Sequence, residues 1–106
     1  GQVLAALDAS GMADDTLVIY TSDHGDMLGE KGLFMKGLMY EGSAGIPMIL
    51  RGPGVAAGDE CDTPVSIVDI PATILDQVVN VSADELPGTS LVSLGPNDDE
   101  RVVFSE

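Results

Sequence analysis

Basic residues are scarce in this chain. Only four occur among its 106 residues, against 18 aspartates and glutamates, which gives a formal net charge of −14. A field of this sign repels nucleic-acid phosphates and anionic lipid head groups, so we expect neither nucleic acid nor a membrane as a partner. Three interpretations of the acidic residues stay open: a solvated surface, adaptation to high salt, and ligands for a cation.

Cysteine, aromatic residues and long apolar runs are also few. Cys61 is the only cysteine, which excludes an intrachain disulfide and a zinc site built from cysteines, and it leaves the compartment undetermined. Two Phe, two Tyr and no Trp leave any core to aliphatic side chains and Met. No apolar run approaches the roughly 18 residues of a membrane span. With 44% hydrophobic residues, the chain is expected to form one small folded domain.

The order of expected elements indicates an α/β architecture. They are a helix that contains Val3, Leu4 and Leu7 and ends at Gly11, a strand over residues 17–20, a loop over 23–45 with a helical turn near 35–40, a strand over 47–50, a helix from 66 to about 79 that begins like a capping box, and a strand over 101–105. The continuous apolar run at 17–20 is typical of a strand covered on both faces, as in a parallel sheet.

The loop over residues 23–45 contains six glycines, a density that disfavours both helix and strand. Long ordered loops in compact domains are usually functional. Asp23 and His24 follow the expected buried strand directly, where α/β sheets bind their ligands. Their carboxylate and imidazole can converge on one cation, although two ligands are too few for a closed site. A hydrogen-bonded turn is the alternative interpretation.

Three motifs follow one another at close spacing: TSDHGDMLG at residues 21–29, KGLMYEGS at 36–43 and IPMI at 46–49. Together they resemble the sulfatase family of the alkaline phosphatase superfamily. His after Asp resembles the choline-sulfatase and phosphonate monoester hydrolase branch, because other sulfatases place Asn there. The resemblance extends over nearly the whole chain through weaker motifs: DT at 15–16, GPG at 52–54, VDIPATIL at 68–75 and LPGTSL at 86–91.

The resemblance implies a partial α/β/α sandwich of the alkaline-phosphatase type with a mostly parallel sheet. It also implies that Asp23 and His24 bind a divalent cation, Ca²⁺ or Mn²⁺ rather than Zn²⁺, and the imidazole favours Mn²⁺. Lys36 would contact the oxygens of a sulfate ester, adding positive charge where the transferred group is negative. The alternative for Lys36 is a solvated side chain. Tyr40 and Glu41 are expected to anchor the loop.

Two departures from the family pattern concern the chemistry. Gly45 stands where many relatives carry Arg, and no Cys/Ser-x-Pro-x-Arg motif for a formylglycine nucleophile is present, since Asp62 and Thr63 follow Cys61. We therefore expect residues 1–106 to be one segment from the carboxy-terminal half of a sulfatase catalytic domain. It would lack the formylglycine nucleophile, be inactive alone, and have the missing remainder of that domain as its partner.

Other functions stay open at this stage. The same charges would serve hydrolysis of phosphate diesters or phosphonate monoesters. A non-catalytic acidic module that binds a cation or a partner chain is a second alternative, and a degenerate remnant is a third. We also expect self-association through an exposed strand edge at residues 17–20.

Overall fold

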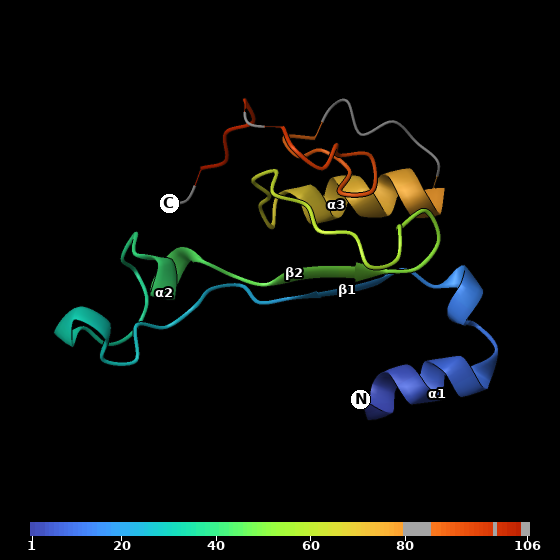
Figure 1. Cartoon of the computed structure of the whole chain (residues 1–106), viewed down its shortest axis with the longest axis horizontal. Coiled ribbons are helices and arrows are strands. Elements are labelled where there is room, and N and C mark those ends of the chain that lie inside the picture. The colour runs from blue at the N-terminus through green and yellow to red at the C-terminus, as the bar shows by residue number, and fades with distance from the viewer. Residues whose placement is uncertain (80–85, 99, 105–106) are drawn as a thin grey trace. The chain divides into compact units, whose positions relative to one another are not determined.

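A computed structural model of the chain describes residues 1–79, 86–98 and 100–104 (Figure 1). The chain divides into two compact units, Gly1–Ala57 and Gly58–Glu106. Within the described ranges, no helix combines the length and the apolar character that crossing a membrane would require.

The first unit begins with a helix and contains one pair of strands. Helix α1 spans Gln2–Ser10 and ends at Gly11, whose φ of 74° is the left-handed conformation typical of a helix-terminating glycine. Strands β1, Val18–Thr21, and β2, Met48–Arg51, pair with each other. At the two ends of the pairing, Val18 lies opposite Arg51 and Thr21 lies opposite Met48. The expected helix end is confirmed, and both strands lie within one residue of their predicted positions.

The mostly parallel sheet is not confirmed. Strands β1 and β2 are antiparallel, and they form the one sheet found among the described residues. Tyr20 and Ile49 are paired and are 63% and 59% exposed, so one face of the pair is open. The apolar run carried no information on strand direction, because β-branched and aromatic residues suit both kinds of sheet. Direction depends on the connection, and here the chain returns without the crossover that parallel pairing needs.

A long loop and α2 extend from one end of the β1–β2 pair (Figure 1). The loop contains a 3₁₀ turn at Glu30–Gly32, and α2 spans Glu41–Ala44, whereas residues 35–40 form no helical turn. The loop folds back on itself, because the Met27 N–H donates to the Met35 carbonyl at 3.1 Å. Met27 is only 2% exposed, so it provides this loop with a buried apolar side chain.

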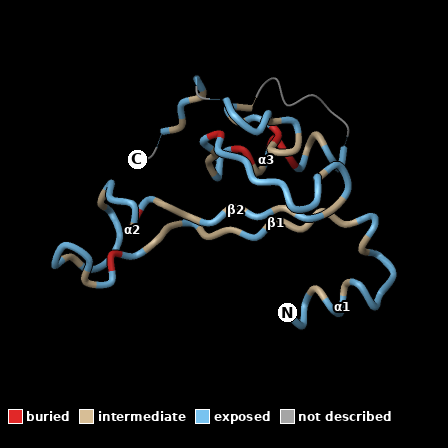
Figure 2. The backbone as a smooth tube through the Cα atoms, viewed as in Figure 1, coloured by how far each residue is buried: buried red, intermediate tan, exposed pale blue. Residues whose placement is uncertain are grey.

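The second unit is organised around α3, Asp69–Ile74, which continues as a π-helical turn over Leu75–Val79. Its buried residues lie in α3 and the segments beside it (Figure 2). The buried residues of this unit are mostly polar: Thr63, Asp69, Ala72, Thr73 and Ser90. The predicted helix is confirmed, although it begins at Asp69 and not at residue 66. No strand forms over residues 101–104, and residue 105 lies outside the described residues.

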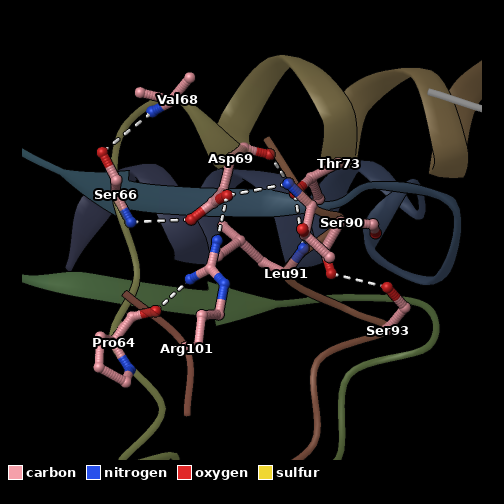
Figure 3. A network of polar contacts seen from close by, with 10 residues as sticks. Pro64, Ser66, Val68, Asp69, Thr73, Ser90, Leu91, Ser93 and Arg101 are labelled. Carbon is pink, nitrogen blue, oxygen red and sulfur yellow. Dashed lines mark hydrogen bonds and ion pairs between the residues drawn. The ribbon is translucent and has the colours of Figure 1, made fainter. Parts of the chain in front are cut away.

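The carboxylate of Asp69 holds the second unit together (Figure 3). It is 1% exposed and accepts hydrogen bonds from the Ser66 N–H at 2.8 Å, the Thr89 N–H at 2.9 Å and the Arg101 guanidinium at 2.6 Å. Arg101 also donates to the Pro64 carbonyl. The bond to Ser66 is the one that the capping-box pattern predicts. The other partners are distant in sequence, so Asp69 joins three segments of the unit.

We expect the second unit to lose stability in acid because of Asp69. Burial raises the pKa of this carboxyl, but the hydrogen bonds from Arg101, Thr89 and Ser66 and the charge of Arg101 outweigh it, so the pKa lies below 3.8. A carboxyl with a lowered folded-state pKa stabilises the fold above its unfolded pKa, and this contribution disappears as the pH falls through the folded pKa.

Amide protection factors within residues 58–79 and 86–98, which correct for the intrinsic pH dependence of exchange, should therefore fall below about pH 4. Asp69→Asn should show a smaller change between pH 6 and pH 3 than the wild type. Equal pH dependence in the two proteins would contradict the assignment.

Candidate active site

The three predicted site residues, Asp23, His24 and Lys36, lie together just beyond the carboxyl end of β1. The Lys36 ammonium is 2.8 Å from Nε2 of His24, although the two residues are 12 positions apart. The Asp23 carboxylate lies 3.6 Å from the same nitrogen. A carboxylate, an imidazole and an ammonium therefore meet at one point. Their chemical roles remain predictions.

The hydrogen bonds of His24 identify its neutral tautomer. Nδ1 is 2.7 Å from the Gly25 carbonyl, which can only accept, so Nδ1 carries the proton. Nε2 faces the ammonium of Lys36, which can only donate, so Nε2 presents its lone pair. A backbone carbonyl that fixes one nitrogen as donor leaves the other as a ligand, the arrangement typical of metal-binding histidines.

Asp23 is ionised at neutral pH and open to solvent, with 81% of its side chain exposed. Its pKa lies below the usual 3.8, because its own backbone N–H donates to it. The electrostatic effect of His24, the N–H of His24 and the ammonium of Lys36 act in the same direction. The His24 N–H donates to Oδ1 at 3.1 Å, which orients the carboxylate beside the imidazole. The hydrogen-bonded turn and the ligand pair are therefore compatible interpretations of the same residues.

The backbone around Lys36 is strained. Met35 has φ of 73° and Gly37 has φ of 96°, so Lys36 stands between two residues in the left-handed region. Glycine accepts that conformation readily, but for Met it costs energy and persists only where surrounding contacts hold it. Such strain is concentrated at functional sites.

Helix α2 packs closely against the turn that carries His24. A Cβ atom at Gly25 would lie 2.2 Å from the Gly42 carbonyl oxygen, so only glycine allows this approach. Buried Ser43 lies in the same helix and contacts both sides of the site. Sequence reasoning gave Ser43 no role, and the only local signal was a polar residue inside the KGLMYEGS motif.

The expected anchors of the loop also lie in this region. The Tyr40 carbonyl accepts from the N–H groups of Ser43 and Ala44, both at 2.9 Å, and the Tyr40 ring lies 5.0 Å from the Lys31 ammonium. The Glu41 carboxylate lies beside Gly45, within 2.3 Å of the position a Cβ there would take. Both contacts agree with a role in holding the loop.

The residues present fit part of a divalent-cation site. A carboxylate and a neutral imidazole nitrogen are ligands that Mn²⁺ accepts, and Ca²⁺ would use mainly the carboxylate. Two side chains do not complete a coordination shell. In the described part of the chain, no group of three or more His, Cys, Asp or Glu side chains is arranged to hold a metal. Asp23 and His24 therefore fit part of the coordination shell of a divalent cation.

Comparison with known proteins assigns the family. Residues 1–81 match the sulfatase family model. The chain is 45% identical over 94 residues to arylsulfatase K of Danio rerio, covering 89% of this chain and 18% of that protein. It is 44% identical over 97 residues to the choline-sulfatase of Rhizobium meliloti (strain 1021), covering 91% and 19%.

A solved structure is also similar. It is that of BT4656 in complex with its substrate D-glucosamine-2-N,6-O-disulfate, with a TM-score of 0.81 and 36% identity, covering 92% of this chain and 20% of that one. The chain thus spans about a fifth of the length of the relatives it matches. The family model matches most of the chain, and this chain belongs to the sulfatase family.

Proposed function

We propose that this chain supplies one side of the active site of a sulfuric ester hydrolase. The observation that carries the proposal is the meeting of Asp23, His24 and Lys36, with the ammonium 2.8 Å from the imidazole nitrogen that presents its lone pair. A negative group, a neutral ligand and a positive group at one point suit an anionic ester held beside a cation.

Each residue has a distinct role in this proposal. Asp23 and His24 hold a divalent cation, Mn²⁺ or Ca²⁺, through a carboxylate oxygen and Nε2. The cation, when bound, neutralises negative charge on the sulfate group. Lys36 and the cation compete for the same lone pair of His24, so Lys36 leaves Nε2 when the cation binds. Its three N–H donors then become available for the sulfate oxygens.

The names of the relatives favour sulfate over phosphate. Both curated relatives described above are sulfatases, and the similar solved protein has a sulfated glucosamine as its substrate. In our proposal the formylglycine nucleophile and the remaining ligands belong to sequence outside these 106 residues, as do the strands of a mostly parallel sheet. The chain alone is then expected to show no turnover.

A chimera tests this proposal. The corresponding segment of the Rhizobium meliloti choline-sulfatase, 44% identical over 97 residues, is replaced by this chain. The chimera should hydrolyse the sulfate ester substrate of that enzyme, and the isolated chain should not.

Matched substrates distinguish the alternative chemistry. A phosphonate monoester and a phosphate diester are assayed beside the sulfate ester. A folded chimera with no activity on any of these esters would contradict the proposal and favour a non-catalytic cation-binding module. Preference for the phosphonate would replace sulfate with the alternative substrate class.

A further inference from the structure

We propose that Ser43 is a positioning residue that holds Lys36 beside His24, an inference that rests on the proposed function of these two side chains. Ser43 lies in α2, Glu41–Ala44, and is 4% exposed. It acts through the backbone of the two residues that follow Lys36 and of the residue that follows His24.

The hydroxyl of Ser43 controls the lysine side of the site. Its oxygen accepts from the Gly37 N–H at 3.2 Å and from the Leu38 N–H at 3.4 Å. These two N–H groups come directly after Lys36 in the chain. One buried oxygen therefore fixes the backbone from which the Lys36 side chain extends.

The carbonyl of Ser43 controls the histidine side. It accepts from the Gly25 N–H at 2.8 Å, directly after His24. The Gly25 carbonyl in turn accepts from Nδ1 of His24 at 2.7 Å, which sets the tautomer. The two sides of the site thus meet at one residue through two different atoms.

The strain around Lys36 explains why this support matters. Met35 and Gly37 both adopt positive φ, 73° and 96°, on either side of the lysine. A Met in that region returns to an ordinary conformation when its surroundings no longer hold it. Without the Ser43 hydroxyl, the N–H groups of Gly37 and Leu38 lose the partner that fixes this turn, and the lysine is free to move into solvent.

The two atoms of Ser43 can be separated by substitution. Ser43→Ala removes the hydroxyl and keeps the carbonyl. We therefore expect Lys36 to leave His24 while the ring of His24 keeps its Nδ1–H tautomer. If Ser43 had a merely structural role, its substitution would disturb the lysine side and the histidine side together, or neither of them.

Nuclear magnetic resonance of the 106-residue chain measures both sides at once. His24 is the only histidine, so its ring nitrogens are assigned without ambiguity. In the wild type we expect a nuclear Overhauser effect between the Lys36 side chain and the His24 ring. In Ser43→Ala this effect should disappear, the tautomer should stay, and the Gly37 and Leu38 amides should exchange at least about tenfold faster.

Two variants serve as controls. Ser43→Thr keeps the hydroxyl and should restore the contact and the slow exchange. Ser10→Ala makes the same change at an exposed residue whose hydroxyl donates to the Leu7 carbonyl at 2.6 Å, and it should leave the site unchanged. Persistence of the Lys36 contact in Ser43→Ala, or a Ser43→Thr that behaves like Ser43→Ala, would overturn the inference.

Loss of the contacts between β1 and β2 would show that Ser43→Ala fails to fold. In that case, amide exchange in the wild type tests the inference instead. Gly37 and Leu38 amides that exchange slower than in an unstructured peptide would support the inference, and unprotected amides would overturn it. None of these measurements uses a cation or a substrate. An inactive chimera with an intact Ser43 effect would therefore refute the proposed function alone.

Discussion

Replacing Lys36 with alanine should lower kcat/KM of the chimera for its sulfate ester by about 100-fold or more, because removing one group that stabilises developing negative charge typically costs about 10²–10³ in rate. Lys36 is the one basic side chain seen beside His24 in the described structure, with its ammonium 2.8 Å from Nε2. The chain as a whole carries a net charge of −14, so a local positive group is needed to attract an anionic ester.

Lys31→Ala is the matched control for this prediction. This substitution removes the same charge from the same loop, but the Lys31 ammonium lies 5.0 Å from the centroid of the Tyr40 ring. Its kcat/KM should stay within a few-fold of the unsubstituted chimera. Equal losses in the two variants would mean that Lys36 acts only through general charge.

Replacing Asp69 with alanine should destabilise the second unit by about 3–5 kcal/mol, because it leaves a partly buried charge without its partner. The Arg101 side chain is 15% exposed and the Asp69 side chain 1% exposed, so solvent cannot replace the lost carboxylate. The N–H groups of Ser66 and Thr89 lose their acceptor at the same time. Native-state amide exchange within residues 58–79 and 86–98 measures this loss.

A second ion pair of equal length provides the control. Arg51 and Asp8 are also 2.6 Å apart, but their side chains are 50% and 51% exposed. Asp8→Ala should cost the first unit no more than about 1 kcal/mol, because exposed pairs contribute little. Similar losses in the two variants would contradict the role assigned to burial.

Local features of the fold were predictable from the sequence. Gly11 marked the end of α1, and the pattern from Ser66 to Asp69 placed the start of a helix within three residues of the observed start of α3 at Asp69, because both depend on neighbouring residues only. The long loop was predictable in part: its glycines disfavour regular structure, but a 3₁₀ turn forms at Glu30–Gly32 and α2 forms at Glu41–Ala44. The antiparallel pairing of β1 and β2 was not, because strand direction depends on the path of the whole loop.

Contacts between distant residues were harder to predict. Residue spacing alone does not bring Lys36 to His24, and the expectation came from the resemblance to sulfatases. The pairing of Asp69 with Arg101 spans 32 residues and left no local pattern. Ser43 is similar, because a buried serine looks like any other small polar residue until its hydroxyl is seen to accept from Gly37 and Leu38.

Paramagnetic broadening by Mn²⁺ tests the central claim most directly, which is that Asp23, His24 and Lys36 face one cation. At low Mn²⁺, the signals of these three residues should broaden before those of Asp14 and Asp15, an adjacent acidic pair in the same unit that lacks an imidazole. Asp23→Ala should remove that difference. Broadening at Asp14 and Asp15 that equals that at His24, or that is unchanged by Asp23→Ala, would contradict the account.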